Sequence, residues 1–171
     1  MARVRRGPRV GFLTDAFAME SFVRNVVSHM QAGKDLAGPA GTLQFRAFPG
    51  LNEIELGEEP EVTYLSAEQS NSSVIIGGST VLKLIRHVRP GVHPELEMSS
   101  FLTEHGFAYC AQMLGQMTRV DDHGEPHALM VLQRFVNNQG DAWQWTQSTL
   151  ERAIRDPVSY THLTLPTNRE V

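Results

Sequence analysis

The chain has 171 residues, of which 41% are hydrophobic and 20% charged, and its formal net charge at pH 7 is −4. This composition suits one globular domain or a part of one, and it excludes the basic footprint of a nucleic-acid-binding protein. No apolar run is long enough to cross a membrane and no signal peptide is recognisable, so we expect a cytoplasmic protein. Cys110 is the single cysteine, which excludes an internal disulfide, and we expect a structural thiol there.

The first part of the chain predicts one helix and two strands. Apolar residues recur at helical spacing over residues 15–32, and Gly33 is a suitable end for that helix. Residues 41–48 and 61–66 alternate between apolar and polar side chains, which predicts strands. Acidic and turn-forming residues fill the segment between these strands.

The second part predicts two hairpins and two helices. The elements in chain order are two strands around a tight turn at Gly77-Gly78, a helix over 94–106, strands over 113–120 and 128–136, a polar link at 137–141 and a helix over 143–155. The sequence therefore predicts an α+β fold with an antiparallel sheet of roughly five strands and one main helix, preceded by extra N-terminal structure.

One predicted strand carries a lysine in its interior. Residues 80–86 read Thr-Val-Leu-Lys-Leu-Ile-Arg, so Lys83 has apolar neighbours. A buried ammonium is unfavourable unless an anion meets it. Glu97, in the predicted helix that follows, is a candidate partner, and Glu95 lies nearby in the first turn, where an acid also favours the helix dipole. A strand lysine followed by a helix glutamate is how kinase-like folds hold ATP phosphates.

Several segments together resemble the maltokinases. They are residues 68–74, 81–84, 89–97, 101–104 and 131–141, followed by Trp143 and Trp145. The resemblance covers most of residues 10–156. Enzymes of this family occur alone or fused behind a trehalose synthase. They phosphorylate maltose with ATP and Mg²⁺ to give maltose 1-phosphate, which feeds α-glucan synthesis.

The resemblance implies a division of the chain. The fold is similar to that of aminoglycoside phosphotransferases. Residues 1–66 would form an N-terminal α/β cap, incomplete because its expected tryptophan-containing opening is absent. Residues 67–136 would form the kinase-like ATP-binding small lobe, and residues 137–156 the hinge link and first helix of a large lobe.

The resemblance also implies the nucleotide-binding residues. Lys83 would pair with the ATP α/β-phosphates and Glu97 would orient it. Asn71, Ser72 and Ser73 would replace a glycine-rich loop at a hairpin tip, with their polar groups turned toward a phosphate. Gln133 and Phe135 would belong to the hinge that meets adenine, mostly through backbone groups. No histidine spacing suggests a metal site, and Trp143 and Trp145 are expected to pack in a core.

The end of the chain has a different character. Residues 157–171 resemble translated sequencing-adapter bases, so we expect a non-native tail and a gene fragment. Phosphoryl transfer needs an Asp base and metal-binding Asp and Asn residues, which this fold places in the large lobe after the hinge. We therefore expect no catalytic or metal-binding residue in this chain and no activity of the fragment alone.

Two alternatives remain open from the sequence. The same fold could phosphorylate another small molecule, because the lobe that binds the acceptor is missing. The chain could instead be a non-catalytic binding module in which Lys83 is structural. The second alternative predicts no effect of nucleotide on stability.

Overall fold

A computed structural model describes residues 2–65, 71–137 and 142–155. The predicted non-native tail at 157–171 and most of the polar link at 137–141 lie outside these residues. The chain divides into two compact units, 1–136 and 137–171, and each is described by itself. In the described ranges, no helix has the length and apolarity that a bilayer span requires.

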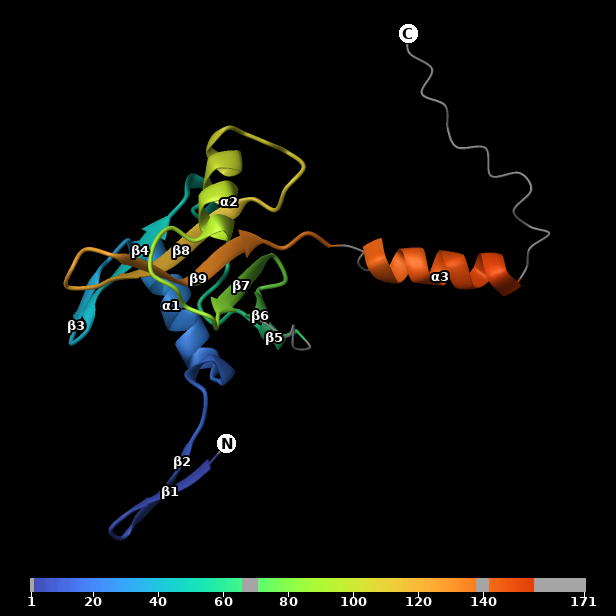
Figure 1. Cartoon of the computed structure of the whole chain (residues 1–171). Coiled ribbons are helices and arrows are strands. Elements are labelled where there is room, and N and C mark those ends of the chain that lie inside the picture. The colour runs from blue at the N-terminus through green and yellow to red at the C-terminus, as the bar shows by residue number, and fades with distance from the viewer. Residues whose placement is uncertain (1, 66–70, 138–141, 156–171) are drawn as a thin grey trace. The chain divides into compact units, whose positions relative to one another are not determined.

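One antiparallel sheet organises the first unit. Its strands are β3 (Leu36–Gly38), β4 (Gly41–Ala47), β5 (Val62–Tyr64), β6 (Asn71–Ile76), β7 (Thr80–Ile85), β8 (Met113–Val120) and β9 (Pro126–Arg134). Their order across the sheet is β3-β4-β8-β9-β7-β6-β5. Strands from both sides of residue 66 thus share one sheet. The predicted α+β class is confirmed, and Figure 1 shows few helices around this sheet.

Helix α1 (Glu20–Ala32) covers one face of the sheet. Its buried side chains, spaced as the sequence predicts, are Val23, Val26, Val27 and Met30. They pack in one apolar cluster with strand residues such as Leu82 and Leu132. The helix begins after a short 3-10 turn (Ala16–Ala18), where the Asp15 side chain accepts a hydrogen bond from the Phe17 N–H. It ends at Gly33, whose φ of 57° is the left-handed geometry that glycine adopts readily.

Helix α2 (Pro94–Glu104) lies on the opposite face of the sheet (Figure 1). Leu96 is its buried residue, and it packs in a second apolar cluster with Phe48, Ile85, Met113, Ala128 and Val131. Since successive strand side chains point to opposite faces, Leu82 on β7 belongs to the α1 face and its neighbours belong to the α2 face. The two helices therefore cover the two faces of the same central strands.

The N-terminal residues form a hairpin that the sequence patterns did not predict. Strands β1 (Ala2–Arg6) and β2 (Arg9–Leu13) pair with each other and not with the main sheet. All ten of their residues are exposed. A short 3-10 turn, η2 (Pro49–Leu51), follows β4 and buries Leu51.

The second unit contains helix α3 (Ala142–Arg155). Trp143 and Trp145, predicted to pack in a core, are 70% and 71% exposed. Within this unit the described residues do not bury the two rings, so the predicted core packing is not seen there.

Candidate functional site

Lys83 occupies the middle of β7, between β6 and β9. Its register partners are Ser73 on β6 and Val131 on β9. The side chain is half-buried rather than buried, with 30% of its surface exposed. Its Nζ donates a hydrogen bond of 3.0 Å to Glu95 Oε1 on α2. The expected carboxylate partner therefore exists, and the ammonium lies on the α2 face of the sheet.

The glutamate in this ion pair is Glu95 and not the predicted Glu97. Glu95 stands in the first turn of α2, where the helix passes close to β7. Two residues further along an α-helix, a side chain points about 200° around the axis. Glu97 is consequently exposed on the other flank of α2, where it lines a separate cavity. The residue pattern could not separate the two glutamates, because both lie near the start of the helix.

Ser73 shares a face with Lys83. The two residues are direct partners across an antiparallel ladder, so their side chains point to the same side. Ser73 is 8% exposed, and its Oγ is buried with no hydrogen-bond partner in the described chain. An unsatisfied buried hydroxyl costs about 1–3 kcal/mol, so this atom is a candidate for a contact that the protein alone does not supply.

Ser72 points the other way, contrary to the prediction. Its Oγ accepts a hydrogen bond of 2.9 Å from Arg86 Nε, and Arg86 also pairs with Asp15 at 2.6 Å. Hydrogen bonding by the Phe17 N–H, and then by Arg86, lowers the pKa of Asp15 from its usual value. Asn71 begins β6 opposite Ile85, but its side chain and the preceding residues 66–70 lie outside the described structure.

The predicted hinge follows β9. Gln133 is buried, and its Nε2 donates to Ser99 Oγ on α2 at 3.4 Å. Phe135 is half-buried, and its backbone N–H donates to the Ser79 carbonyl at 2.8 Å. The Arg134 N–H donates to the Gln112 carbonyl. These two backbone donors are therefore occupied within the protein and are not free to meet a base in this structure.

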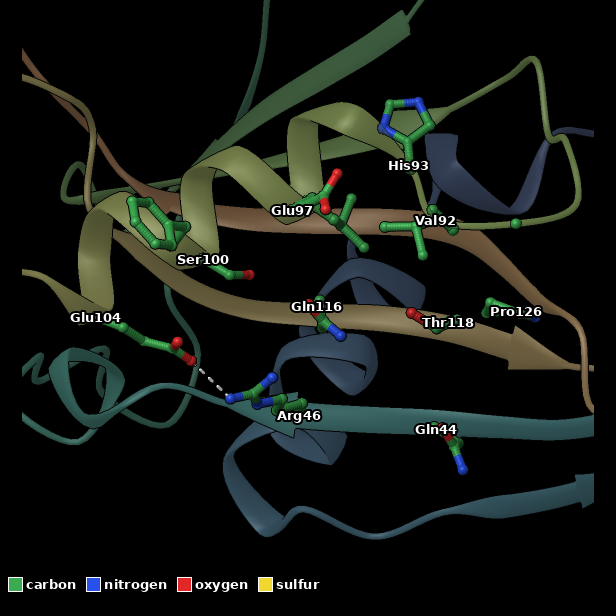
Figure 2. A pocket seen from close by; sticks show the side chains of 14 residues that line it. Gln44, Arg46, Val92, His93, Glu97, Ser100, Glu104, Gln116, Thr118 and Pro126 are labelled. Atoms are coloured by element: carbon green, nitrogen blue, oxygen red, sulfur yellow. Dashed lines mark hydrogen bonds and ion pairs between the residues drawn. The ribbon is translucent and has the colours of Figure 1, made fainter.

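A cavity of about 400 Å³ lies on the other flank of α2. Figure 2 shows Gln44 and Arg46 on β4, and Gln116 and Thr118 on β8, beneath the helix residues that complete its wall. This polar group was not among the predicted site residues. The signal in the sequence was the alternation of polar residues along 41–48 and 113–120, which places Gln44, Arg46, Gln116 and Thr118 on one face of two paired strands.

No metal centre is found in the described residues, where no group of three or more His, Cys, Asp or Glu side chains is placed to hold an ion. Cys110 is a half-buried free thiol, and its Sγ lies 3.6 Å from the Phe107 carbonyl oxygen.

Asp121 organises the turn between β8 and β9. Its Oδ2 lies 3.1 Å from His127 Nε2, and its Oδ1 accepts from the N–H groups of His123 and Glu125, each at 2.9 Å. The hydrogen bond from His127, followed by that from the Glu125 N–H, lowers the pKa of Asp121 from 3.8 to about 2. The charged carboxylate is therefore favoured in the folded state.

This shift predicts a pH dependence of stability. Asp121 stabilises the folded state above pH 3.8, and this stabilisation is lost as the pH falls toward 2. The reason is that the carboxyl binds a proton at a higher pH in the unfolded chain than in the folded protein. We expect Asp121→Asn to flatten the loss of unfolding free energy in acid, measured by urea denaturation. Asp122→Asn, at the exposed neighbouring position, is the control and should leave the dependence of the unfolding free energy on pH unchanged. Equal slopes for wild type and Asp121→Asn would contradict the assignment.

The described fold is similar to solved structures of glucosamine kinases. One, in complex with glucosamine, ADP and inorganic phosphate, matches with a TM-score of 0.56 and 20% identity, over 92% of this chain and 34% of that chain. Another, a glucosamine kinase in crystal form A, matches with a TM-score of 0.52 and 19% identity, over 92% of this chain and 33% of that chain.

Sequence comparison points in the same direction. The glucosamine kinase of Mycolicibacterium smegmatis is 29% identical over 114 residues, which are 66% of this chain and 27% of that protein. No protein-family model matches the chain. The chain thus spans about a quarter of this curated relative. Together with the antiparallel sheet, the comparisons show that this chain has the fold of part of a kinase-like protein and support a relationship to sugar kinases.

Proposed function

We propose that this chain is the ATP-binding part of a sugar kinase. The observation that carries the proposal is the ion pair of Lys83 and Glu95 at 3.0 Å, on a central strand. A helix glutamate orients the lysine ammonium toward one side, as binding of nucleotide phosphates requires. The ADP in a solved glucosamine kinase of the same fold supports this proposal.

The buried hydroxyl of Ser73 extends the proposed phosphate site. It lies on the same face as Lys83 and has no partner in the described chain, so a phosphate oxygen could accept its hydrogen bond. Gln133 and Phe135 remain proposed as part of the wall around the base, by side-chain packing rather than by the occupied Phe135 N–H. We do not place Ser72 at the phosphates, because its hydroxyl is bound to Arg86 on the other face.

Magnesium ions would accompany ATP in the reaction. When bound, they would neutralise phosphate charge, and we propose that their ligands and the catalytic base belong to a large lobe outside this chain. The curated relative and the solved structures are about three to four times longer than the segments that this chain matches in them.

For the acceptor sugar we propose maltose, phosphorylated to maltose 1-phosphate in α-glucan and trehalose metabolism in the cytoplasm. The resemblance of residues 68–141 to maltokinases supports this acceptor and the proposed fusion behind a trehalose synthase. Glucosamine is the second candidate, because the relative that matches in sequence is a glucosamine kinase. Phosphorus NMR separates them: a kinase that includes the proposed large lobe is incubated with ATP and with each sugar in turn, and the acceptor is the sugar that yields a phosphate ester.

The two glutamates of α2 provide a test of the nucleotide site. Mg-ATP should raise the melting temperature of the 171-residue chain, because a ligand that binds only the folded form stabilises it. Glu95→Gln should weaken Mg-ATP binding about fivefold, as expected for loss of a half-exposed ion pair worth up to about 1 kcal/mol. Glu97→Gln, the matched control on the other flank, should leave binding unchanged.

Isothermal titration calorimetry gives the affinities for both variants. If Glu97→Gln weakens binding and Glu95→Gln does not, the bound protein uses the glutamate that the sequence predicted. If nucleotide changes neither the melting temperature nor the heat signal of the wild type, the proposal that this chain binds ATP fails.

A further inference from the structure

The cavity beside α2 has a polar floor. Gln44 pairs with Thr118, and Arg46 pairs with Gln116, across β4 and β8, so the four side chains form a compact array on one face. Elsewhere on this face the strands present apolar residues to the same helix, including Val131 and Ile85. A sheet face covered by a helix is ordinarily apolar. Within the array only Thr118 is buried, Gln116 is half-buried, and Gln44 and Arg46 are exposed, so the array lies where this face opens to solvent.

The hydrogen-bonding capacity of the floor is largely unused. Thr118 is 9% exposed, and its Oγ1 is buried without a partner in the described chain. The hydrogen bonds and ion pairs found among residues 2–65, 71–137 and 142–155 include none to the carboxamides of Gln44 and Gln116 (Figure 2). The residues that line this cavity of about 400 Å³ thus include the exposed amide of Gln44, the half-buried amide of Gln116 and Thr118 with its buried hydroxyl.

Helix α2 forms the wall with one continuous stripe of its surface. Glu97, Ser100, Phe101 and Glu104 follow the spacing i, i+3, i+4 and i+7 and all line the cavity. Glu104 pairs with Arg46 at 2.9 Å, which neutralises both charges. Glu97 has no cation within ion-pair distance in the described chain, so the lining carries one excess negative charge.

We propose that this cavity is a binding site for a saccharide, separate from the proposed nucleotide site. Amides and hydroxyls that both donate and accept hydrogen bonds suit the vicinal hydroxyls of a sugar. The ring of Phe101 is 53% exposed at the wall and offers an apolar surface to a sugar face. The excess negative charge disfavours nucleotides and sugar phosphates, and Glu97 would favour an amino sugar over a neutral one.

The test uses the complete 171-residue chain labelled with ¹⁵N and titrated with glucosamine and with maltose. We expect saturable shifts of the side-chain NH₂ signals of Gln44 and Gln116 at millimolar sugar, with glucosamine bound more tightly. Gln116→Leu should weaken binding at least about fivefold, the effect of losing an uncharged hydrogen-bonded group. Gln147→Leu, at an exposed position of α3, is the matched control and should bind as the wild type does.

Two further variants separate a failure of the saccharide site from misfolding of Gln116→Leu and from a failure of the nucleotide proposal. Thr118→Val preserves shape while removing the hydroxyl, and it replaces Gln116→Leu if that variant does not fold. Lys83→Ala should retain sugar binding, so a failure of the nucleotide proposal leaves this test intact. The absence of saturable shifts with both sugars, or unchanged affinity in a folded Gln116→Leu or Thr118→Val protein, would overturn the site.

Discussion

Replacing Lys83 with alanine is expected to abolish most of the stabilisation of this chain by Mg-ATP. Charge-assisted hydrogen bonds contribute about 1.5–3 kcal/mol, so the affinity for nucleotide should fall roughly 10–100-fold. At a nucleotide concentration that saturates the wild type, the rise in melting temperature should then nearly disappear. Differential scanning fluorimetry with and without Mg-ATP measures this directly.

The same experiment distinguishes binding from folding. Lys83 is half-exposed and its ion pair with Glu95 contributes at most about 1 kcal/mol, so the variant should remain folded without nucleotide. Lys34→Ala is the matched control, because Lys34 is exposed in the turn that follows α1. If Lys83→Ala and Lys34→Ala show the same nucleotide response as the wild type, Lys83 is structural and the proposed function fails.

Replacing Leu82 with alanine should destabilise the fold more than any of the polar substitutions proposed above. Leu82 is fully buried on the α1 face of a central strand, within the larger apolar cluster. Truncating such a leucine removes apolar burial and leaves a cavity, with a typical loss of about 2–5 kcal/mol, roughly half the stability of a small domain. Urea denaturation followed by circular dichroism should show a midpoint shift of this size with little change in slope.

Leu13→Ala is the control for this prediction. Leu13 is 66% exposed at the end of β2, so the same truncation there should change the unfolding free energy by no more than about 0.5 kcal/mol. Equal effects of the two substitutions would mean that Leu82 is not part of the folded core in solution.

The periodicities of the sequence predicted the helices and the strands of the main sheet except β3, which lies in a segment without a clear strand pattern. The spacing of apolar residues in α1 and the Gly77-Gly78 pair are local signals that can be recognised without knowing the tertiary contacts. The order of strands in the sheet did not follow from these patterns. In particular, β4 pairs with β8, which is distant from it in the sequence, and only tertiary packing specifies that pairing.

The sequence predicted which strand and which helix carry the candidate site, but it did not predict which of their side chains meet there. Lys83 could be recognised because an ammonium between apolar strand residues requires a partner. The choice of Glu95 over Glu97 depends on how α2 is rotated against β7, which residue types alone do not determine. Likewise, Ser72 and Ser73 differ only in the sheet face to which they point, and a shift of one residue in register would exchange them.

The strands contributed by residues before 66 have a consequence for any shorter version of this protein. They form both borders of the main sheet, with β3 at one end and β5 at the other. Removing them would leave β8 and β6 with unpaired backbone groups along their open sides, and such edges recruit strands from other molecules. A protein trimmed to residues 67–136 should therefore aggregate through edge-to-edge pairing, even though every residue of the Lys83 site would be retained.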